Sequence, residues 1–130
     1  MADPDACRFA KTHEWTFLDG GTAVVGLSDH AQKEITDVVF VELPKPGRRV
    51  AQGEACAVVE SVKAAFDVYA PVSGEIAEVN AALSAEPALV NQSPYEKGWF
   101  FKIKADAATG AQSLMTHAQY QAFLKESAAH

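Results

Sequence analysis

The side chains that most often do chemistry are scattered along this chain. Its four histidines, His13, His30, His117 and His130, lie far apart, so a metal site would need ligands from distant elements. Cys56 lies in an apolar, strand-like run, where a thiol is buried and unreactive. The sequence has neither a G-x-S-x-G elbow nor a glycine-rich phosphate loop. An enzyme built from these side chains alone is not expected; a small hydrolase or thiol enzyme using Cys56 or His30 is the remaining alternative of that kind.

One lysine stands out by its position. Lys63 lies in Ser61-Val62-Lys63-Ala64, between two strand-like runs. The segment contains no Gly, Asn or Pro, so a type I turn suits it better than a primed hairpin turn. A lone lysine in a turn is most often a solvated tip. Here the stiff flanking strands and the small Ala64 and Ala65 favour an amine that a modifying enzyme can grip and acylate.

The elements that must position this hairpin are mostly strands. Alternating β-branched and aromatic residues, with turn residues such as 19–21 between them, predict strands at 13–18, 22–27, 38–41 and 99–104. Asp29 and Gln32 predict the start of a short helix, with Asp29 as the cap. Thr116 and Gln119 predict the start of a C-terminal helix over 116–127, whose apolar stripe is Tyr120, Phe123 and Leu124.

A weak internal repeat accompanies these strands. Residues 41–47 and 68–74 both read V-x-(L/A)-P-x-x-G. Each copy leads a strand to a proline that ends its ladder and a glycine that permits a turn. The repeat indicates two similar strand-turn-strand units that form two halves of one sandwich.

Composition limits the classes of function. The chain has 130 residues with a formal net charge of −6, which suits a single domain over 1–130 and disfavours nucleic acid as a partner. No apolar run approaches the roughly 18 residues that span a bilayer, so no membrane contact is expected. The acidic N-terminus resembles no targeting signal, and residues 1–8 are expected to be a loose leader. Two cysteines make no disulfide framework, which is typical of a reducing compartment.

The hairpin also resembles a known sequence segment. Residues 60–65, Glu-Ser-Val-Lys-Ala-Ala, followed by 67–75, resemble the lipoyl-attachment segment of the glycine cleavage system H proteins. Further segments are similar to that family in the same order: 13–15, 25–32, 38–44, 89–91 and 94–99. The resemblance runs from about Phe9 to the C-terminal helix. It implies a mostly β, lipoyl-domain-like barrel-sandwich hybrid of antiparallel strands, with a short helix in the N-terminal half and a C-terminal helix.

The resemblance implies a carrier and not an enzyme. Lipoate would be attached to Lys63 through an amide by a lipoate ligase or lipoyl transferase. The arm would take the aminomethyl group of glycine from a pyridoxal phosphate glycine decarboxylase to an aminomethyltransferase. A dihydrolipoyl dehydrogenase would then reoxidise it.

Two further expectations concern the site residues. The recognition hairpin for the lipoylating enzyme would be Glu60, Ser61, Val62 and Ala64 around Lys63. Glu14 is the candidate for sheltering the loaded arm, because a carboxylate in an aromatic segment can pair with a protonated amine; a solvated strand residue is the alternative.

The chain departs from the family pattern in two places. Ile35-Thr36-Asp37 replaces the usual Leu-Gly-Asp, which puts the bend after the short helix in question, and Phe66 replaces a small residue near Lys63. The nearest rival classes are biotin carriers, which place methionines beside the lysine, and the lipoyl domains of 2-oxo acid dehydrogenases, which place an acid before it. Val62 and Ala64 fit neither. The expected location is the bacterial cytoplasm, or the mitochondrial matrix for a processed organellar form.

Overall fold

The computed structural model describes residues 3–106 and 114–128. Its elements follow one another along the chain as a 3-10 helix, nine strands and four α-helices within those residues: η1 (Pro4–Ala6), β1 (Arg8–Phe9), β2 (Glu14–Asp19), β3 (Thr22–Leu27), α1 (Asp29–Ile35), β4 (Val38–Glu42), β5 (Arg49–Val50), β6 (Ala55–Ser61), β7 (Ala65–Tyr69), β8 (Gly74–Val79), α2 (Ala82–Ala85), α3 (Leu89–Gln92), β9 (Phe101–Ala105) and α4 (His117–Ala128). No helix among these residues is long and apolar enough to cross a membrane.

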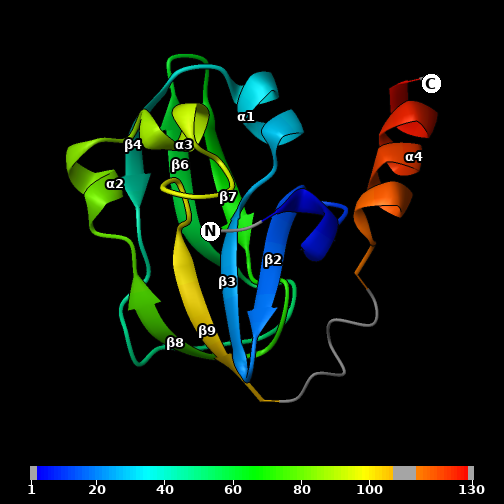
Figure 1. The fold of residues 1–130 in the computed structure, drawn as a ribbon. Helices are drawn as coiled ribbons and strands as arrows, with labels where there is room; N and C mark the ends of the chain where they lie inside the picture. Colours follow the sequence, from blue (N-terminus) through cyan, green and yellow to red (C-terminus); the bar gives the residue numbers. More distant parts are fainter. Residues whose placement is uncertain (1–2, 107–113, 129–130) are drawn as a thin grey trace.

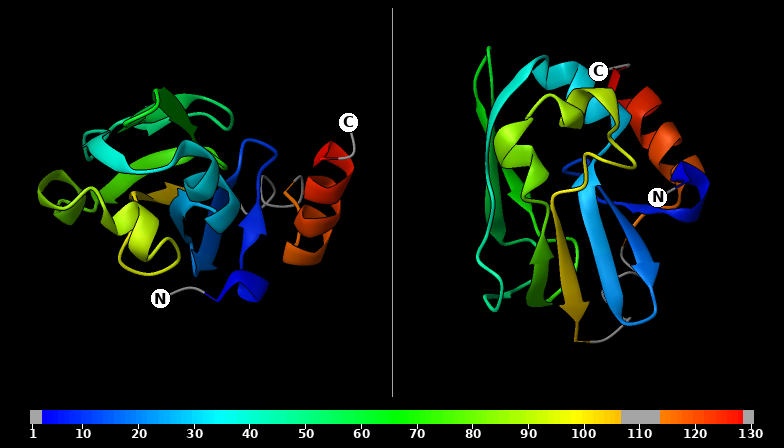
Figure 2. Two further views of the ribbon diagram at one scale, coloured as in Figure 1. Left: turned by 90° about the horizontal axis from the view of Figure 1, so that it is seen from above. Right: turned by 60° about the vertical axis from the view of Figure 1, so that its left-hand side comes forward.

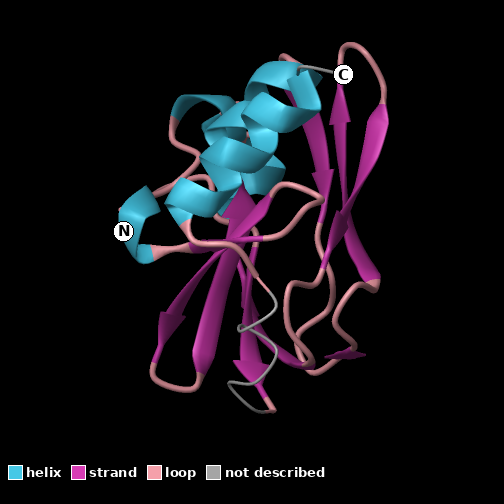
Figure 3. Cartoon of the chain, turned by 90° about the vertical axis from the view of Figure 1, so that its right-hand side faces the viewer, coloured by secondary structure: helices cyan, strands magenta, loops and turns pink. Residues whose placement is uncertain are grey.

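The strands form two antiparallel sheets. Six strands are ordered β1-β2-β3-β9-β8-β5, and three are ordered β4-β6-β7. The two sheets lie as separate layers, with the helices gathered toward one end (Figure 1, Figure 3). One cluster of buried aliphatic and aromatic side chains fills the space between them, from Val25 and Ile103 on the larger sheet to Val59 and Val68 on the smaller. The predicted mostly β fold with antiparallel strands, a short early helix and a C-terminal helix is confirmed.

The internal repeat has a structural counterpart. In both copies the chain leaves the three-stranded sheet, from β4 or β7, and enters the six-stranded sheet as β5 or β8. These two arriving strands pair with each other, Arg49 opposite Glu75 and Val50 opposite Gly74. The proline and glycine of each copy therefore mark the crossing from one sheet to the other, as expected for two halves of one sandwich.

The short helix α1 starts one residue earlier than the sequence indicated. Ser28 is the N-cap, and its hydroxyl accepts a hydrogen bond from the Ala31 N–H (3.1 Å). Asp29 instead accepts one from the Gln32 side chain (2.9 Å). Serine and aspartate cap helices about equally well, so the sequence pattern could not separate the two adjacent positions.

Thr36 ends α1 in a conformation that glycine normally occupies. Its φ is 65° and its ψ is −151°. The Thr36 carbonyl accepts a hydrogen bond from the Asn91 side chain (2.7 Å), and the Asn91 oxygen accepts one from the Val38 N–H (2.9 Å). Asn91 therefore holds the bend, so the non-glycine residue is accommodated with local backbone strain.

One segment differs from expectation. Residues 1–8 were expected to be a loose leader, but η1 and β1 are ordered, and Cys7 is only 2 % exposed. Burial of Cys7 beside Phe9, Trp15 and Tyr120 explains this order, since the apolar residues of the segment complete a second core cluster.

The C-terminal helix packs on this second cluster and is capped as its sequence indicated. The Gln119 N–H donates to the Thr116 hydroxyl (3.2 Å), and the Thr116 N–H donates to the Gln119 side chain (2.9 Å). Tyr120 is buried, and Phe123 and Leu124 are partly buried against the cluster. α4 thus lies alongside the start of the chain, at the side of the molecule opposite the three-stranded sheet (Figure 1).

Candidate functional site

Lys63 lies at the tip of the β6–β7 hairpin, at one end of the molecule (Figure 1). The hairpin closes with a hydrogen bond from the Ser61 N–H to the Ala64 carbonyl (2.9 Å). The Ser61 hydroxyl accepts hydrogen bonds from the Lys63 N–H (3.1 Å) and the Ala64 N–H (3.2 Å). One serine side chain therefore satisfies the backbone donors that a tight turn without Gly or Asn leaves unpaired.

The tip is also tied to the rest of the protein. The Val62 N–H donates to the Asp37 carbonyl (3.0 Å), which lies between α1 and β4. The Lys63 Nζ donates to the Glu34 carbonyl in the last turn of α1 (3.2 Å). The Lys63 side chain is exposed, and Val62 beside it is 69 % exposed. The backbone of the turn is fixed while its side chains remain accessible.

A cavity of about 620 Å³ opens beside this tip. Its walls come from the segment before β2, from α1, from the inner side of the hairpin and from α4, and include Thr12, His13, Glu34, Phe66, Tyr69 and Phe123. Glu34 lines the cavity, and its carbonyl accepts the hydrogen bond from the Lys63 amine, so the amine lies next to the cavity wall. Phe66, the departure from the family pattern, packs on the inner side of the hairpin as part of this wall.

Glu14 lies behind that wall and does not line the cavity. It is 1 % exposed, so the alternative of a solvated strand residue is wrong. Its carboxylate accepts hydrogen bonds from the Thr12 hydroxyl and from the Tyr69 N–H (3.0 Å), and both partners line the cavity. Burial raises the pKa of Glu14 to about 7, although the hydrogen bonds from Thr12 and Tyr69 work in the opposite direction.

Tyr120 fastens α4 to the far wall of the cavity. Its hydroxyl lies 2.7 Å from the His13 Nδ1 and 2.7 Å from the Ser28 Oγ. Burial lowers the pKa of His13, and the nearby His30 lowers it further. Ser28 at the start of α1, His13 before β2 and Tyr120 of α4 thus form one polar cluster that joins three parts of the cavity wall.

The thiols offer no reactive group. Cys56 is 6 % exposed, its Sγ lies 3.7 Å from the Val68 carbonyl, and burial raises its pKa to about 12. Burial likewise raises the pKa of Cys7 to about 12. Neither is a thiolate at neutral pH, which argues against a thiol enzyme. Among the residues that the structure describes, no group of three or more His, Cys, Asp or Glu side chains could hold a metal ion.

The structure brings most of the sequence-predicted residues together. Ser61, Val62, Lys63 and Ala64 form the turn, and Glu60 precedes it on β6, exposed. Glu14 is separate from the turn and is linked to it through the cavity wall. Sequence reasoning missed Thr12, Glu34 and Tyr69, because their contribution comes from hydrogen bonds between segments far apart in the chain.

Two antiparallel sheets that present an exposed lysine on a braced hairpin are the arrangement of a carrier-type domain. The model of the glycine cleavage H-protein family matches residues 7–127. A glycine cleavage system H protein of Acidiphilium cryptum is 55 % identical over 117 residues, covering 90 % of this chain and 94 % of the relative. The Escherichia coli H protein (strain IAI39) is 51 % identical over 124 residues, 95 % and 96 % of the two chains.

A solved structure agrees with the sequence comparisons. The crystal structure of a glycine cleavage system H protein from Mycobacterium marinum superposes with a TM-score of 0.87 at 34 % identity, covering 95 % of this chain and 99 % of the other. The chain belongs to the glycine cleavage H-protein family, the non-catalytic lipoyl carriers of the glycine cleavage system.

The raised pKa of Glu14 predicts a pH-dependent stability. Between its ordinary value of 4.5 and about 7, the folded state binds a proton that the unfolded state has lost, so the free energy of unfolding falls as pH rises through this window. Glu14→Gln removes the charge; its amide oxygen can accept from the Tyr69 N–H while its amide NH2 donates to the Thr12 hydroxyl. Relative to wild type, the variant should gain up to about 3 kcal/mol between pH 5 and pH 8. Urea unfolding at the two pH values measures this.

Glu54→Gln is the matched control. Hydrogen bonds from Ala51 and Arg48 hold the pKa of exposed Glu54 below 4.5, so its difference from wild type should not change between pH 5 and pH 8. If the free energy of unfolding of Glu14→Gln also differed from wild type by the same amount at pH 5 and pH 8, Glu14 would not be a buried carboxyl with a raised pKa.

Proposed function

We propose that Lys63 carries lipoate through an amide bond, and that the chain takes the aminomethyl group of glycine from a glycine decarboxylase to an aminomethyltransferase before dihydrolipoyl dehydrogenase reoxidises the arm. The observation that supports this most is the placement of Lys63: an exposed amine on a turn whose backbone hydrogen bonds are satisfied by Ser61 and Asp37. Membership of the family supports the same assignment.

The residues around Lys63 fit such a group. The Nζ donates to a backbone carbonyl, and within the described residues it takes part in no ion pair that acylation would break. An amide nitrogen keeps one N–H, so the Glu34 carbonyl can still be satisfied after acylation. The neighbours Val62 and Ala64 are both exposed, and Ala64 is small, which leaves room for a long arm.

The chain's own residues position the arm. When bound, the lipoyl group supplies a dithiolane that takes up and passes on the one-carbon unit. The braced hairpin fixes where the arm starts, and tethering raises its effective concentration at each enzyme that the carrier meets. Glu60, Ser61, Val62 and Ala64 form the recognition hairpin that the ligase or transferase reads around Lys63.

Glu14 supplies a negative charge that helps the cavity hold the loaded arm. The cavity lies beside Lys63, and a group that enters it is less exposed to water than one on the surface. The Thr12 hydroxyl donates to Glu14, which leaves its oxygen lone pairs for a protonated amine in the cavity. The negative charge of Glu14 strengthens that contact from behind the wall.

The partner set and location follow from the family and from charge. The net charge of −6 favours enzymes with basic docking surfaces and salt-sensitive encounters. The relatives described above are bacterial, which supports the cytoplasm of a bacterium as the location.

Lys63→Arg should abolish modification, because arginine keeps the charge and length but has no acylable amine. Expression with lipoate and a competent ligase, followed by intact mass, should show one lipoyl increment on wild type and none on the variant. Lys33→Arg, an exposed lysine of α1, should be modified as wild type. A biotin increment, or wild type that stays unmodified, would contradict the proposal.

Glu14→Gln should shorten the lifetime of the carried one-carbon unit. Removing the charge weakens a charge-assisted hydrogen bond, so release should be about tenfold faster at pH 8. At pH 6, where most of the wild-type carboxyl is protonated, the two proteins should differ much less. Timed release from the loaded carrier at both pH values measures this; equal lifetimes at pH 8 would remove Glu14 from the shelter.

A further inference from the structure

The three-stranded sheet has an outer face, turned away from the six-stranded sheet, that exposes large apolar side chains next to Lys63. Of the five exposed large apolar residues in the described part of the chain, three lie here: Val39 (55 % exposed), Phe40 (50 %) and Val62 (69 %). We call these three the hairpin patch. Their backbones are neighbours, because the Val62 N–H binds the Asp37 carbonyl and Phe40 pairs with Glu60 across β4 and β6.

Carboxylates frame the hairpin patch. The register places Phe40, Glu60 and Ala65 in one row across the three strands, and Glu42, Val58 and Asp67 in the next. Glu42, Glu60 and Asp67 are all exposed. Within residues 3–106 and 114–128, none of the three takes part in an ion pair. The patch is therefore an apolar spot beside uncompensated negative charge.

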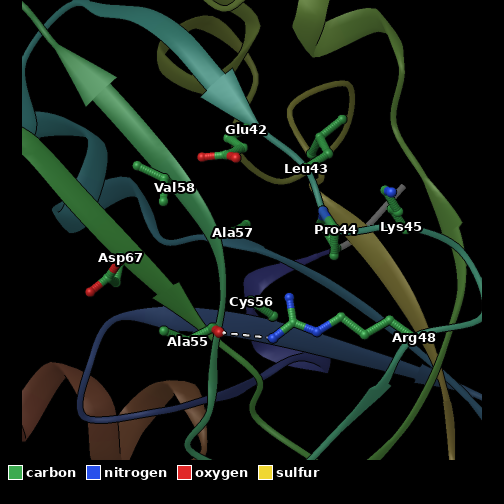
Figure 4. Close-up of a pocket in the computed structure, with 10 residues that line it drawn as sticks. All are labelled: Glu42, Leu43, Pro44, Lys45, Arg48, Ala55, Cys56, Ala57, Val58 and Asp67. Atoms are coloured by element: carbon green, nitrogen blue, oxygen red, sulfur yellow. Dashed lines mark hydrogen bonds between the residues drawn. The ribbon is translucent and has the colours of Figure 1, made fainter.

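Two cationic side chains lie farther along the outer face of the three-stranded sheet. A groove of about 510 Å³ runs under the connection from β4 to β5 and is lined by Glu42, Val58 and Asp67 at one end and by Lys45 and Arg48 at the other. Figure 4 shows Asp67 and the two cations on opposite sides of the groove. Both cations are exposed; Arg48 is paired with Glu54 (2.8 Å), whereas Lys45 has no ion pair with any described residue. With carboxylates at one end of the groove and cations at the other, a partner with an uneven charge distribution binds in one orientation better than in the reverse.

The short distance from the hairpin patch to Lys63 favours a partner that acts on the lysine itself. An enzyme that acylates the unmodified lysine must bring its active centre to the Nζ itself. Phe40 pairs three residues before Lys63, roughly 10 Å along the strands. A standard interface covers about 800 Å² on each partner, a disc of roughly 16 Å radius. Enzymes that act on the end of the arm can dock farther away, but the acylating enzyme cannot.

We propose that the hairpin patch, with Glu42 and Glu60, is the docking surface for the enzyme that acylates Lys63 with lipoate. The facing surface of that enzyme carries an apolar spot bordered by Lys or Arg side chains. This inference rests on the proposed attachment of lipoate to Lys63. It assigns a binding role to β4, which lies outside the hairpin turn in the three-stranded sheet (Figure 2).

Steady-state lipoylation of the unmodified chain by a purified lipoate ligase tests this. Phe40→Ser should raise the KM for the chain about tenfold with kcat within twofold, because an apolar contact made only on docking is lost. Leu18→Ser is the matched control: Leu18 is also exposed (36 %) but lies near the β2–β3 turn, at the end of the molecule away from the hairpin. Its KM should equal that of wild type.

Glu42→Lys gives an independent second variant. It reverses an exposed charge outside the turn, so its KM should rise more at low salt than at high salt. Wild-type KM values for both Phe40→Ser and Glu42→Lys, with unchanged thermal unfolding, would overturn the proposal. So would a Phe40→Ser defect confined to the glycine decarboxylase reaction of pre-lipoylated carrier. Lys63→Arg separates the two inferences: continued lipoylation of that variant would refute the attachment site itself.

Discussion

The site depends on the hydrogen bonds that the Ser61 hydroxyl accepts within the turn. A carrier lysine must be exposed enough for an enzyme to surround it. An exposed turn of this kind has no proline to fix φ and no Gly or Asn to favour a primed turn, so its order must come from another source. Ser61 resolves this conflict by accepting hydrogen bonds from the N–H groups of Lys63 and Ala64. Its own N–H closes the hairpin on the Ala64 carbonyl. A side chain thus supplies the order that tertiary packing supplies elsewhere.

The support behind the turn is a short series of contacts that ends in the core. Val62 is tied to the Asp37 carbonyl, and Asp37 lies in the bend that Asn91 holds from α3. The bend keeps the end of α1 against the hairpin, where the Glu34 carbonyl meets the Lys63 amine next to the cavity wall. The strained residue Thr36 therefore lies in the bend that brings α1, β4 and the hairpin together.

The two faces of the three-stranded sheet have separate roles. Val59 and Phe66, which pair on the inner face, line the cavity beside the lysine, and buried Glu14 lies behind that wall. The outer face carries the hairpin patch and its carboxylates. A carrier visited by several enzymes gains from this separation, because one surface can be read by a partner while the other encloses the arm.

The sequence predicted the parts of this structure that are local. Strand alternation, the turn around Lys63 and the capping residues of α4 could all be read from neighbouring positions. The burial of Glu14 could not, because it arises from Thr12 and from Tyr69 of a distant strand. The order of residues 3–8 depends on Tyr120 and Trp15, and the bend at Thr36 depends on Asn91. These are long-range contacts, for which neither periodicity nor turn chemistry gives a signal.

The central claim is that the lysine projects from a rigid tip and that motion belongs to the side chain and its arm alone. Backbone 15N relaxation of the lipoylated protein tests it most directly. The order parameters of Val62, Lys63 and Ala64 should match those of β6 and β7, about 0.85. Values below about 0.6 at these three amides, with rigid strands on either side, would show a flexible loop in place of the braced turn and contradict the account.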